Sequence, residues 1–274
     1  MLLHAPAKLN LCLFLGPARD DGRHEIRSLF EPLSLADEIT VIEAEGDEVV
    51  CPAVGGTNIA ATALAELRGR GWDRPPMRLE IKKRIPVGGG LGGGSADAAA
   101  VLRLAEDDLD GLEEIADRIG ADVPSQLHPS FSLVSGAGER VEQLPPPGDH
   151  AVVLLPQREG LSTAEVYAEA EKLGLGREPE RLAAIEQRLR DAAGGGASPL
   201  EYSHLLFNDL EPAATGLHPG IEPALEALQG AGAARSLISG SGPTAFGLFA
   251  DLESARQAAA DLGGGAIACT PSAA

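Results

Sequence analysis

Alternating polar and apolar residues characterise the start of the chain. Residues 7–15 alternate between the two sides of an extended backbone, as in a β-strand. Alanine and leucine occupy one side, and the other side carries Lys8, Asn10, Cys12 and Phe14. We therefore predict a strand with one continuous apolar side.

Further strands and helices follow without a strict strand–helix–strand alternation. Apolar or alternating runs predict strands at residues 7–15, 26–35, 37–45, 77–85 and 151–156, two more within 235–250, and a last short one near the C-terminus. Periodicity with capping and stop signals predicts helices at residues 59–67, 95–105, 112–119, 164–173, 179–192, 221–230 and 252–262, the first capped by Thr57 or Asn58. This mixed order predicts an α+β fold. The PPPG segment at 145–148 predicts a division into two domains, residues 1–148 and 149–274.

Composition limits the partners of this protein. The 274 residues are 44% hydrophobic, enough for a sizeable core, and the formal net charge is −19. Such a surface repels nucleic acid and anionic membranes. No apolar stretch approaches the roughly 20 residues that span a bilayer, and the apolar N-terminus lacks the basic leader of a signal peptide. With three widely spaced cysteines, which we interpret as reduced thiols, we expect a cytoplasmic protein.

A glycine-rich loop is the most informative segment. Six of the seven residues 88–94 are glycine, which permits close backbone approach and unusual backbone angles. Ser95 then begins an alanine-rich helix whose free N–H groups and dipole point back into the loop. The alternative is a flexible linker, but the loop lies tightly between a strand and a strong helix. We therefore predict a cradle for a di- or triphosphate.

The surroundings of this loop distinguish it from two common phosphate loops. A Walker A loop has lysine followed by serine or threonine after its last glycine, and no lysine stands there. Gly88, Gly90 and Gly93 match the dinucleotide pattern G-x-G-x-x-G, which is weak by itself. The preceding strand alternates with charged residues, and the next segment is predicted to be another helix rather than a strand. The context therefore argues against a Rossmann fold.

Three ordered motifs resemble those of the GHMP kinase superfamily. They are Pro6–Leu11, Pro86–Ala96 and Ser239–Pro243. The resemblance covers nearly the whole chain and implies an N-terminal domain similar to domain 2 of ribosomal protein S5 and a ferredoxin-like C-terminal domain. ATP and an alcohol would meet in the cleft between them, with Mg²⁺ on the phosphates. It assigns ATP binding to Pro86, Val87, Gly88, Gly89, Gly90, Leu91, Gly92, Gly93, Gly94, Ser95 and Ala96, and makes Ser95 a candidate Mg²⁺ ligand.

Three shorter segments resemble one branch of the superfamily, which phosphorylates a cytidine diphosphate-linked sugar alcohol. They are Gly22–Glu25, Ala121–Pro124 and Asn208–Glu211. We expect such a small-molecule substrate, no nucleic acid or membrane partner, and a monomer or homodimer. The alternatives are a GHMP kinase for a homoserine- or mevalonate-type alcohol and a non-catalytic nucleotide-binding relative, which would be expected to lack Lys8 or Asp122. Nucleic-acid binding through the S5-like half is opposed by the charge.

The resemblance implies that Lys8 and Asp122 are catalytic. Lys8 would favour an alkoxide at the acceptor hydroxyl, and Asp122 would accept the hydroxyl proton. A lone lysine on a strand is otherwise usually solvent-facing, and Asp122 before a proline in a first helical turn is typical of an N-cap. The general base need not be strong, because positioning and charge neutralisation dominate phosphoryl transfer.

The resemblance also implies a set of substrate-binding residues. His24 would help hold the cytosine and Tyr167 would cover it, although alone they suggest a surface histidine and a core tyrosine. Arg23 stands where the branch usually has an aromatic residue, and we expect its guanidinium to stack on the base or to pair with a phosphate. Ser239 and Gly240 belong to a second backbone clamp, for which a plain turn is the alternative. The complete set is Asn10, His24, Thr163, Tyr167, Ser239 and Gly240.

Overall fold

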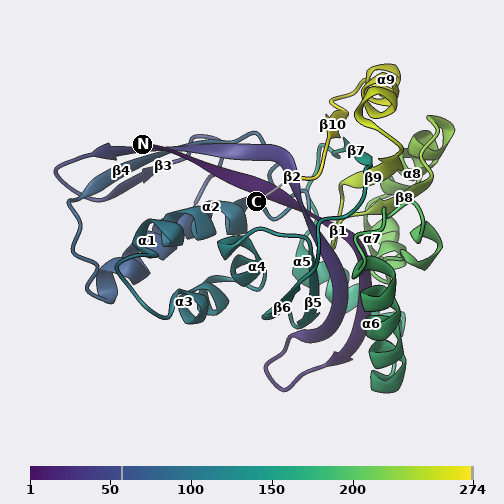
Figure 1. The fold of residues 1–274 in the computed structure, drawn as a ribbon, viewed down its shortest axis with the longest axis horizontal. Coiled ribbons are helices and arrows are strands. Elements are labelled where there is room, and N and C mark those ends of the chain that lie inside the picture. The colour runs from purple at the N-terminus through teal and green to yellow at the C-terminus, as the bar shows by residue number, and fades with distance from the viewer. Residues whose placement is uncertain (57, 273–274) are drawn as a thin grey trace.

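The computed structural model describes residues 1–56 and 58–272, and this part of the chain contains two β-sheets (Figure 1). Two long antiparallel strands, β1 and β2, dominate the larger sheet. Its six strands in spatial order are β3 (Glu48–Val50), β4 (Met77–Lys82), β2 (His24–Glu43), β5 (Ser132–Gly136) and β6 (Arg140–Gln143), with β1 (Leu2–Ala18) on the other edge of β2. Among the paired strands of the described residues, only β3 and β4 are parallel.

Strand β2 corrects one expectation from the sequence. Two separate strands, at 26–35 and 37–45, were expected, but the chain continues as one strand that pairs with β1 over most of its length. On its other edge β5 pairs with residues 26–30 and β4 with 38–43. Pro32 falls in the gap between these partners, where a missing N–H breaks no ladder hydrogen bond on that edge.

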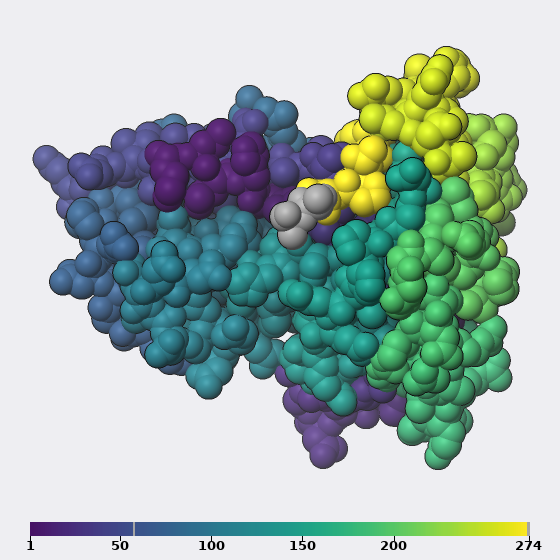
Figure 2. Space-filling model, in the orientation of Figure 1, coloured from purple at the N-terminus to yellow at the C-terminus, as the bar shows by residue number. Residues whose placement is uncertain are grey.

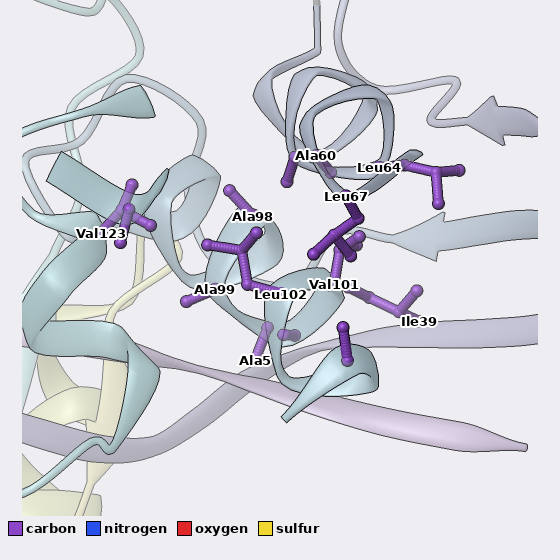
Figure 3. Close-up of a cluster of buried hydrophobic side chains, with 14 of the residues drawn as sticks. Ala5, Ile39, Ala60, Leu64, Leu67, Ala98, Ala99, Val101, Leu102 and Val123 are labelled. Carbon is purple, nitrogen blue, oxygen red and sulfur yellow. The ribbon is translucent and has the colours of Figure 1, made fainter. Parts of the chain in front are cut away.

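Helices cover one face of this sheet and enclose its core (Figures 1 and 3). They are α1 (Ile59–Gly69), α2 (Gly93–Leu102), η1 (Arg103–Ala105), α3 (Leu112–Ile119) and α4 (Val123–Leu127). Asn58 caps α1 by accepting a hydrogen bond from the Ala60 N–H at 2.9 Å, whereas Thr57 lies outside the described residues. The small, fully buried Ala98 and Ala99 let α2 pack closely in this core. Strands β3, β5 and β6 were not predicted, and α4 was anticipated only through the possible N-cap at Asp122.

The smaller sheet carries the remaining helices. Its order is β10 (Ile267–Cys269), β7 (Ala151–Leu155), β9 (Ala245–Phe249) and β8 (Arg235–Ile238), all antiparallel. Counted along the chain this is the order 4-1-3-2, and with its helices it forms the expected ferredoxin-like arrangement. The helical elements are α5 (Thr163–Lys172), α6 (Pro179–Ala193), η2 (Ser203–Leu205), α7 (Glu211–Leu217), α8 (Ile221–Gly230) and α9 (Leu252–Leu262). Of these, α7 was not predicted.

The two sheets meet along β1. Leu13 donates its N–H to the Phe207 carbonyl and accepts from the Asp209 N–H, both at 2.8 Å, so residues 207–209 run beside β1. Leu9 of β1 and Phe246 of β9 belong to one buried apolar cluster. The α+β class is confirmed, and the division after residue 148 stays a prediction.

The surface of the molecule is drawn in Figure 2, where the segment joining β1 to β2 projects at the lower edge and α9 at the upper one. Among the described residues, no helix is long and apolar enough to cross a bilayer.

Candidate active site

A cleft of ≈ 930 Å³ opens between the glycine loop, β1, β2 and α5. Most residues singled out from the sequence line it: Lys8, Asn10, His24, Pro86 through Ser95, Asp122, Thr163, Tyr167 and Gly240. Ala96 and Ser239 are buried and do not line the cleft. Segments separated by more than 200 residues in the chain therefore meet at one place.

The glycine loop has a conformation that side chains would obstruct. Gly88, Gly90 and Gly92 have φ values of +70°, +76° and +67°, in the left-handed region. A Cβ on Gly90 would lie 2.3 Å from the Ser239 carbonyl oxygen, and one on Gly92 would lie 2.7 Å from Lys8 Cγ. Gly92 precedes α2 without a side-chain cap among the described residues, so the first N–H groups of α2 remain available to an anion.

Lys8 is buried against the loop. Its exposed fraction is 5%, which rules out the solvent-facing alternative. The ammonium nitrogen lies 3.1 Å from Asp122 Oδ2, contacts Asn10 Oδ1, and lies 4.7 Å above the Phe30 ring. The Lys8 N–H also donates to the Leu91 carbonyl at 3.0 Å, so the same residue fixes the loop to β1.

Asp122 occupies the N-cap position of α4 without capping it. Within the described chain its carboxylate makes no hydrogen bond to the helix N–H groups and points instead to Lys8. The side chain remains 31% exposed. The carboxylate is therefore both held by a cation and accessible from the cleft.

A turn at residues 239–242 is hydrogen-bonded to the glycine loop. The Ser239 hydroxyl donates to the Gly90 carbonyl at 3.0 Å and accepts from the Asn10 N–H at 3.2 Å. Asn208 donates its side-chain amide to the Ile238 and Gly240 carbonyls at 2.9 and 2.8 Å. These bonds connect both sheets to the glycine loop and give the turn more than a connecting role.

Side chains of β2 and α5 form the end of the cleft away from the glycine loop. His24 Nε2 lies 3.0 Å from Glu171 Oε1, and the His24 and Tyr167 rings have centroids 5.2 Å apart with a 45° tilt. Burial, together with the negative charge of Asp122, raises the pKa of Tyr167 above its ordinary value. The phenol therefore stays neutral and able to donate a hydrogen bond. Thr163 borders this end and shares a hydrogen bond with Ser241 at 3.0 Å.

Arg23 is engaged by two carboxylates at the rim of the cleft. Its guanidinium lies 3.1 Å from Asp21 and 3.2 Å from Asp117, and 37% of the side chain is exposed. The pair with Asp117 holds the segment between β1 and β2 beside α3, and the pair with Asp21 lies within that segment. The guanidinium pairs with two aspartates in this structure, and its stacking on a base or pairing with a phosphate stays a prediction.

A buried charge cluster beneath the loop was missed by the sequence analysis. Lys83 Nζ lies 2.7 Å from Asp97 Oδ2 and also contacts Asp37. Asp37 Oδ1 accepts from the backbone N–H groups of Arg84 and Ile85 at 2.5 and 2.9 Å. Burial, against the opposing charge of Lys83, raises the pKa of Asp97 to about 6. The available signal was a single acid among the alanines at the start of α2.

Comparisons with known proteins agree with this geometry. Residues 55–129 match the GHMP kinases N terminal domain, and residues 197–265 match the GHMP kinases C terminal domain. A relative from Streptomyces coelicolor (strain ATCC BAA-471 / A3(2) / M145), named 4-diphosphocytidyl-2-C-methyl-D-erythritol kinase, is 41% identical over 277 residues, covering 95% of this chain and 91% of that protein. One of the same name from Rhodococcus jostii (strain RHA1) is 36% identical over 286 residues, covering 98% and 90%.

Solved structures give the same result. The crystal structure of a 4-(cytidine 5'-diphospho)-2C-methyl-D-erythritol kinase is 35% identical, has a TM-score of 0.80 and covers 100% of both chains. A homoserine kinase from Cytophaga hutchinsonii, 20% identical with a TM-score of 0.68 over 99% of this chain and 94% of that one, shares the fold. With both domain matches in order and relatives above one-third identity over nearly the full length, this chain belongs to the GHMP kinase family.

Proposed function

We propose that this protein is an ATP-dependent kinase that phosphorylates the 2-hydroxyl of 4-diphosphocytidyl-2-C-methyl-D-erythritol, a step of the non-mevalonate route to isoprenoid precursors. The observation that carries the proposal is the Lys8–Asp122 pair, 3.1 Å apart in the cleft that the glycine loop also lines. The names of the full-length relatives support the choice of substrate.

The glycine loop would hold the triphosphate. Its backbone can approach the phosphates closely, and the N–H groups at the start of α2 favour negative charge. Lys8 contributes a cation that β1 and Asp122 already fix in place. In a protein with a net charge of −19, this local arrangement compensates for a surface that otherwise repels a polyanion.

Asp122 would accept the proton of the acceptor hydroxyl as its oxygen bonds to the γ-phosphorus. The bond from that phosphorus to the bridging oxygen breaks, and ADP leaves with the electron pair. Lys8 stabilises the negative charge on the attacking oxygen, and its contact with Asp122 keeps the carboxylate oriented. Most of the rate enhancement would come from this positioning.

The residues beneath the loop fit a Mg²⁺ ion held mainly by phosphates. Asp97 lines the cleft, and its Oδ1 is buried without a hydrogen-bond partner in the described chain. The described residues contain no group of three or more ligands of the His, Cys, Asp or Glu type, and Mg²⁺ commonly uses one or two protein oxygens plus substrate phosphates. Asp97 and the Ser95 hydroxyl would be these ligands. When bound, the ion neutralises charge on the β- and γ-phosphates.

The His24–Tyr167 end would hold the cytosine. Tyr167 offers an apolar face and a neutral hydroxyl, while Glu171 keeps His24 in a defined orientation. Such a built aromatic end favours a nucleotide-linked alcohol over homoserine or mevalonate, which carry no ring to stack. The retained Lys8–Asp122 pair argues against a non-catalytic relative. The cytoplasmic location and a monomeric or dimeric state stay predictions.

The direct test measures ADP release from Mg·ATP with 4-diphosphocytidyl-2-C-methyl-D-erythritol. We expect turnover by the native protein and a loss of about a thousandfold in kcat for Asp122→Asn, which removes the base but keeps the shape. Asp107→Asn, a solvent-exposed acid elsewhere on the surface, is the matched control and should behave as native. Folded native protein that releases no ADP with this substrate, yet does so with homoserine or mevalonate, would overturn the proposal.

A further inference from the structure

A second cavity, of ≈ 440 Å³, lies beside α6 and outside the cleft. We call it the α6 pocket, and Arg181, Arg188, Ile185, His204, Leu205 and Phe207 line it. It shares no lining residue with the cleft in the described chain. Leu13 lines the cleft and Phe14 lines the α6 pocket, so the two cavities lie on opposite sides of β1. Helix α6 is at the edge of the molecule away from α1 and α3 (Figure 1).

Three arginines line the α6 pocket. The Asp209 carboxylate neutralises one of them, Arg177, and the other two carry the argument. Most lysines and arginines of this acidic protein pair with aspartate or glutamate, yet the side chains of Arg181 and Arg188 have no ion pair or hydrogen bond among the described residues. No carboxylate is among the described residues that line the pocket. Next to it, the Arg235 guanidinium lies 4.9 Å over the Phe207 ring and, within the described chain, donates only to the Leu206 carbonyl.

The pocket is also apolar on one side. Residues 181, 184, 185, 188 and 189 follow helical spacing, so one face of α6 supplies both the arginines and an apolar surface. Phe207 is 47% exposed, and the guanidinium behind it makes a flat surface suited to a planar or aliphatic group. A solvated helix face would provide the charges but would need neither the cavity nor the exposed ring.

We propose that the α6 pocket binds an organic diphosphate. Its phosphates lie against Arg181 and Arg188, whose planar guanidinium groups suit phosphate oxygens. Its organic part covers Ile185, Leu205 and Phe207. The volume lies within the usual range of small-molecule sites, about 300–1,000 Å³. The organic part comes from one of two sources, a nucleoside or an aliphatic chain.

Calorimetric titration of the full-length protein tests this. The cleft is first saturated with Mg·AMP-PNP, and then n-pentyl diphosphate, CDP and inorganic pyrophosphate are titrated separately. We expect one site per chain. At least one organic diphosphate should bind about tenfold more tightly than pyrophosphate, because binding buries several methylene groups or a base away from water. The proposed nucleoside end of the cleft would also bind CDP, so only CDP binding that the double arginine variant below loses is assigned to the α6 pocket. If that binding is the tighter one, the source is a nucleoside, and tighter binding of n-pentyl diphosphate identifies the aliphatic one.

Two variants with the same change in net charge locate the site. Arg181→Gln combined with Arg188→Gln should weaken binding about tenfold or more. Arg256→Glu, which changes an exposed arginine on α9 without a partner in the described chain, should stay within about twofold of native if long-range charge contributes little. Melting temperatures close to native show that both variants fold.

Several results would overturn the proposal. These are no binding by any probe, pyrophosphate binding as tightly as the organic diphosphates, or equal weakening in the Arg256→Glu variant. A native dimer that the double variant dissociates, with no diphosphate bound, would instead identify this surface as a contact between copies of the chain.

Discussion

The phosphate end and the nucleoside end of the cleft are built in different ways. At the phosphate end, backbone, glycines and buried ion pairs determine the shape, as in residues 88–94 and the Lys8–Asp122 pair. At the nucleoside end, the shape comes from side chains such as His24 and Tyr167, carried by the start of β2 and by α5. The phosphate end therefore tolerates little change, whereas the nucleoside end can be altered one side chain at a time.

This difference matches the chemistry at each end. A phosphate group is the same in every nucleoside triphosphate, so a fixed backbone cradle suits it. A base is identified by its edges and faces, which side chains contact. Substitutions at the phosphate end should therefore reduce kcat or stability, and those at the nucleoside end should mainly change KM.

The largest effect is expected from Lys8→Met. Methionine fills similar space but removes the cation that faces Asp122 and the attacking oxygen, so kcat should fall about a thousandfold, or roughly 4 kcal/mol. KM for the cytidine substrate should change little, because Lys8 is not at the base end. Steady-state kinetics measure both values. Lys82→Met, at a side chain that is 72% exposed, is the control, and a comparable loss in it would remove Lys8 from the mechanism.

Lys83→Met should produce the largest loss of stability. It leaves Asp37 and Asp97 buried without their shared cation, which costs about 3–5 kcal/mol for a broken buried ion pair. Denaturant unfolding measures the change. Adding Asp97→Asn should recover part of the loss, because one buried negative charge is removed. Failure of this second substitution to recover any stability would show that the cluster does not act through its charge.

Gly90→Ala tests the backbone packing of the phosphate end. Its Cβ would lie 2.3 Å from the Ser239 carbonyl oxygen, so the loop or the 239–242 turn must move. Gly232 also has a positive φ, +95°, but a Cβ there meets nothing within 4 Å. Gly232→Ala should cost about 1–2 kcal/mol from backbone strain alone. Gly90→Ala should lower the free energy of unfolding by more than Gly232→Ala does, and it should also raise KM for ATP. Equal losses of stability in the two variants would mean that the loop or the turn moves easily to relieve the contact.

The sequence was informative where few residue types satisfy a physical requirement. A strand followed by six glycines and a helix start predicts an anion cradle, and the loop and the helix start have the expected arrangement, whereas anion binding stays a prediction. The ferredoxin-like sheet was implied by the family resemblance and is confirmed in order and direction. Pattern reading divided β2 in two before Asp37, whereas the strand continues there, and the Asp37 carboxylate is buried and accepts two backbone hydrogen bonds.

Contacts between distant segments were not accessible from periodicity. Lys83 lies at the end of a strand-like run and Asp97 in a helix, and only the folded chain brings their charges to 2.7 Å. The α6 pocket was missed for a related reason. On a helix, Arg181 and Arg188 have the pattern of an ordinary solvated face, and the lack of an ion pair to either side chain in the described residues depends on tertiary packing. Short elements such as α4 are too brief to produce a periodic signal.

At the nucleoside end, His24→Ala should raise KM for the cytidine substrate about tenfold while kcat falls less than twofold. The loss of one aromatic contact and one hydrogen bond accounts for roughly 1.4 kcal/mol. His128→Ala, at an exposed histidine outside the cleft, is the matched control. A fall in kcat as large as that expected for Lys8→Met would show that the two ends do not act separately.

Arg23→Tyr should have the smallest effect on KM for the cytidine substrate. Whether KM falls or rises is the informative result. The ion pairs of Arg23 with Asp21 and Asp117 are partly exposed, so their loss should cost no more than about 1 kcal/mol of stability. An aromatic ring at this rim can stack on the base, and an added stacking contact of about 1 kcal/mol lowers KM for the cytidine substrate roughly three- to fivefold. If KM instead rises tenfold or more, Arg23 leaves its aspartates to hold the substrate's diphosphate, and the nucleoside end recognises charge as well as the base. Because Arg23→Gln removes the charge without adding a ring, its KM separates these two explanations.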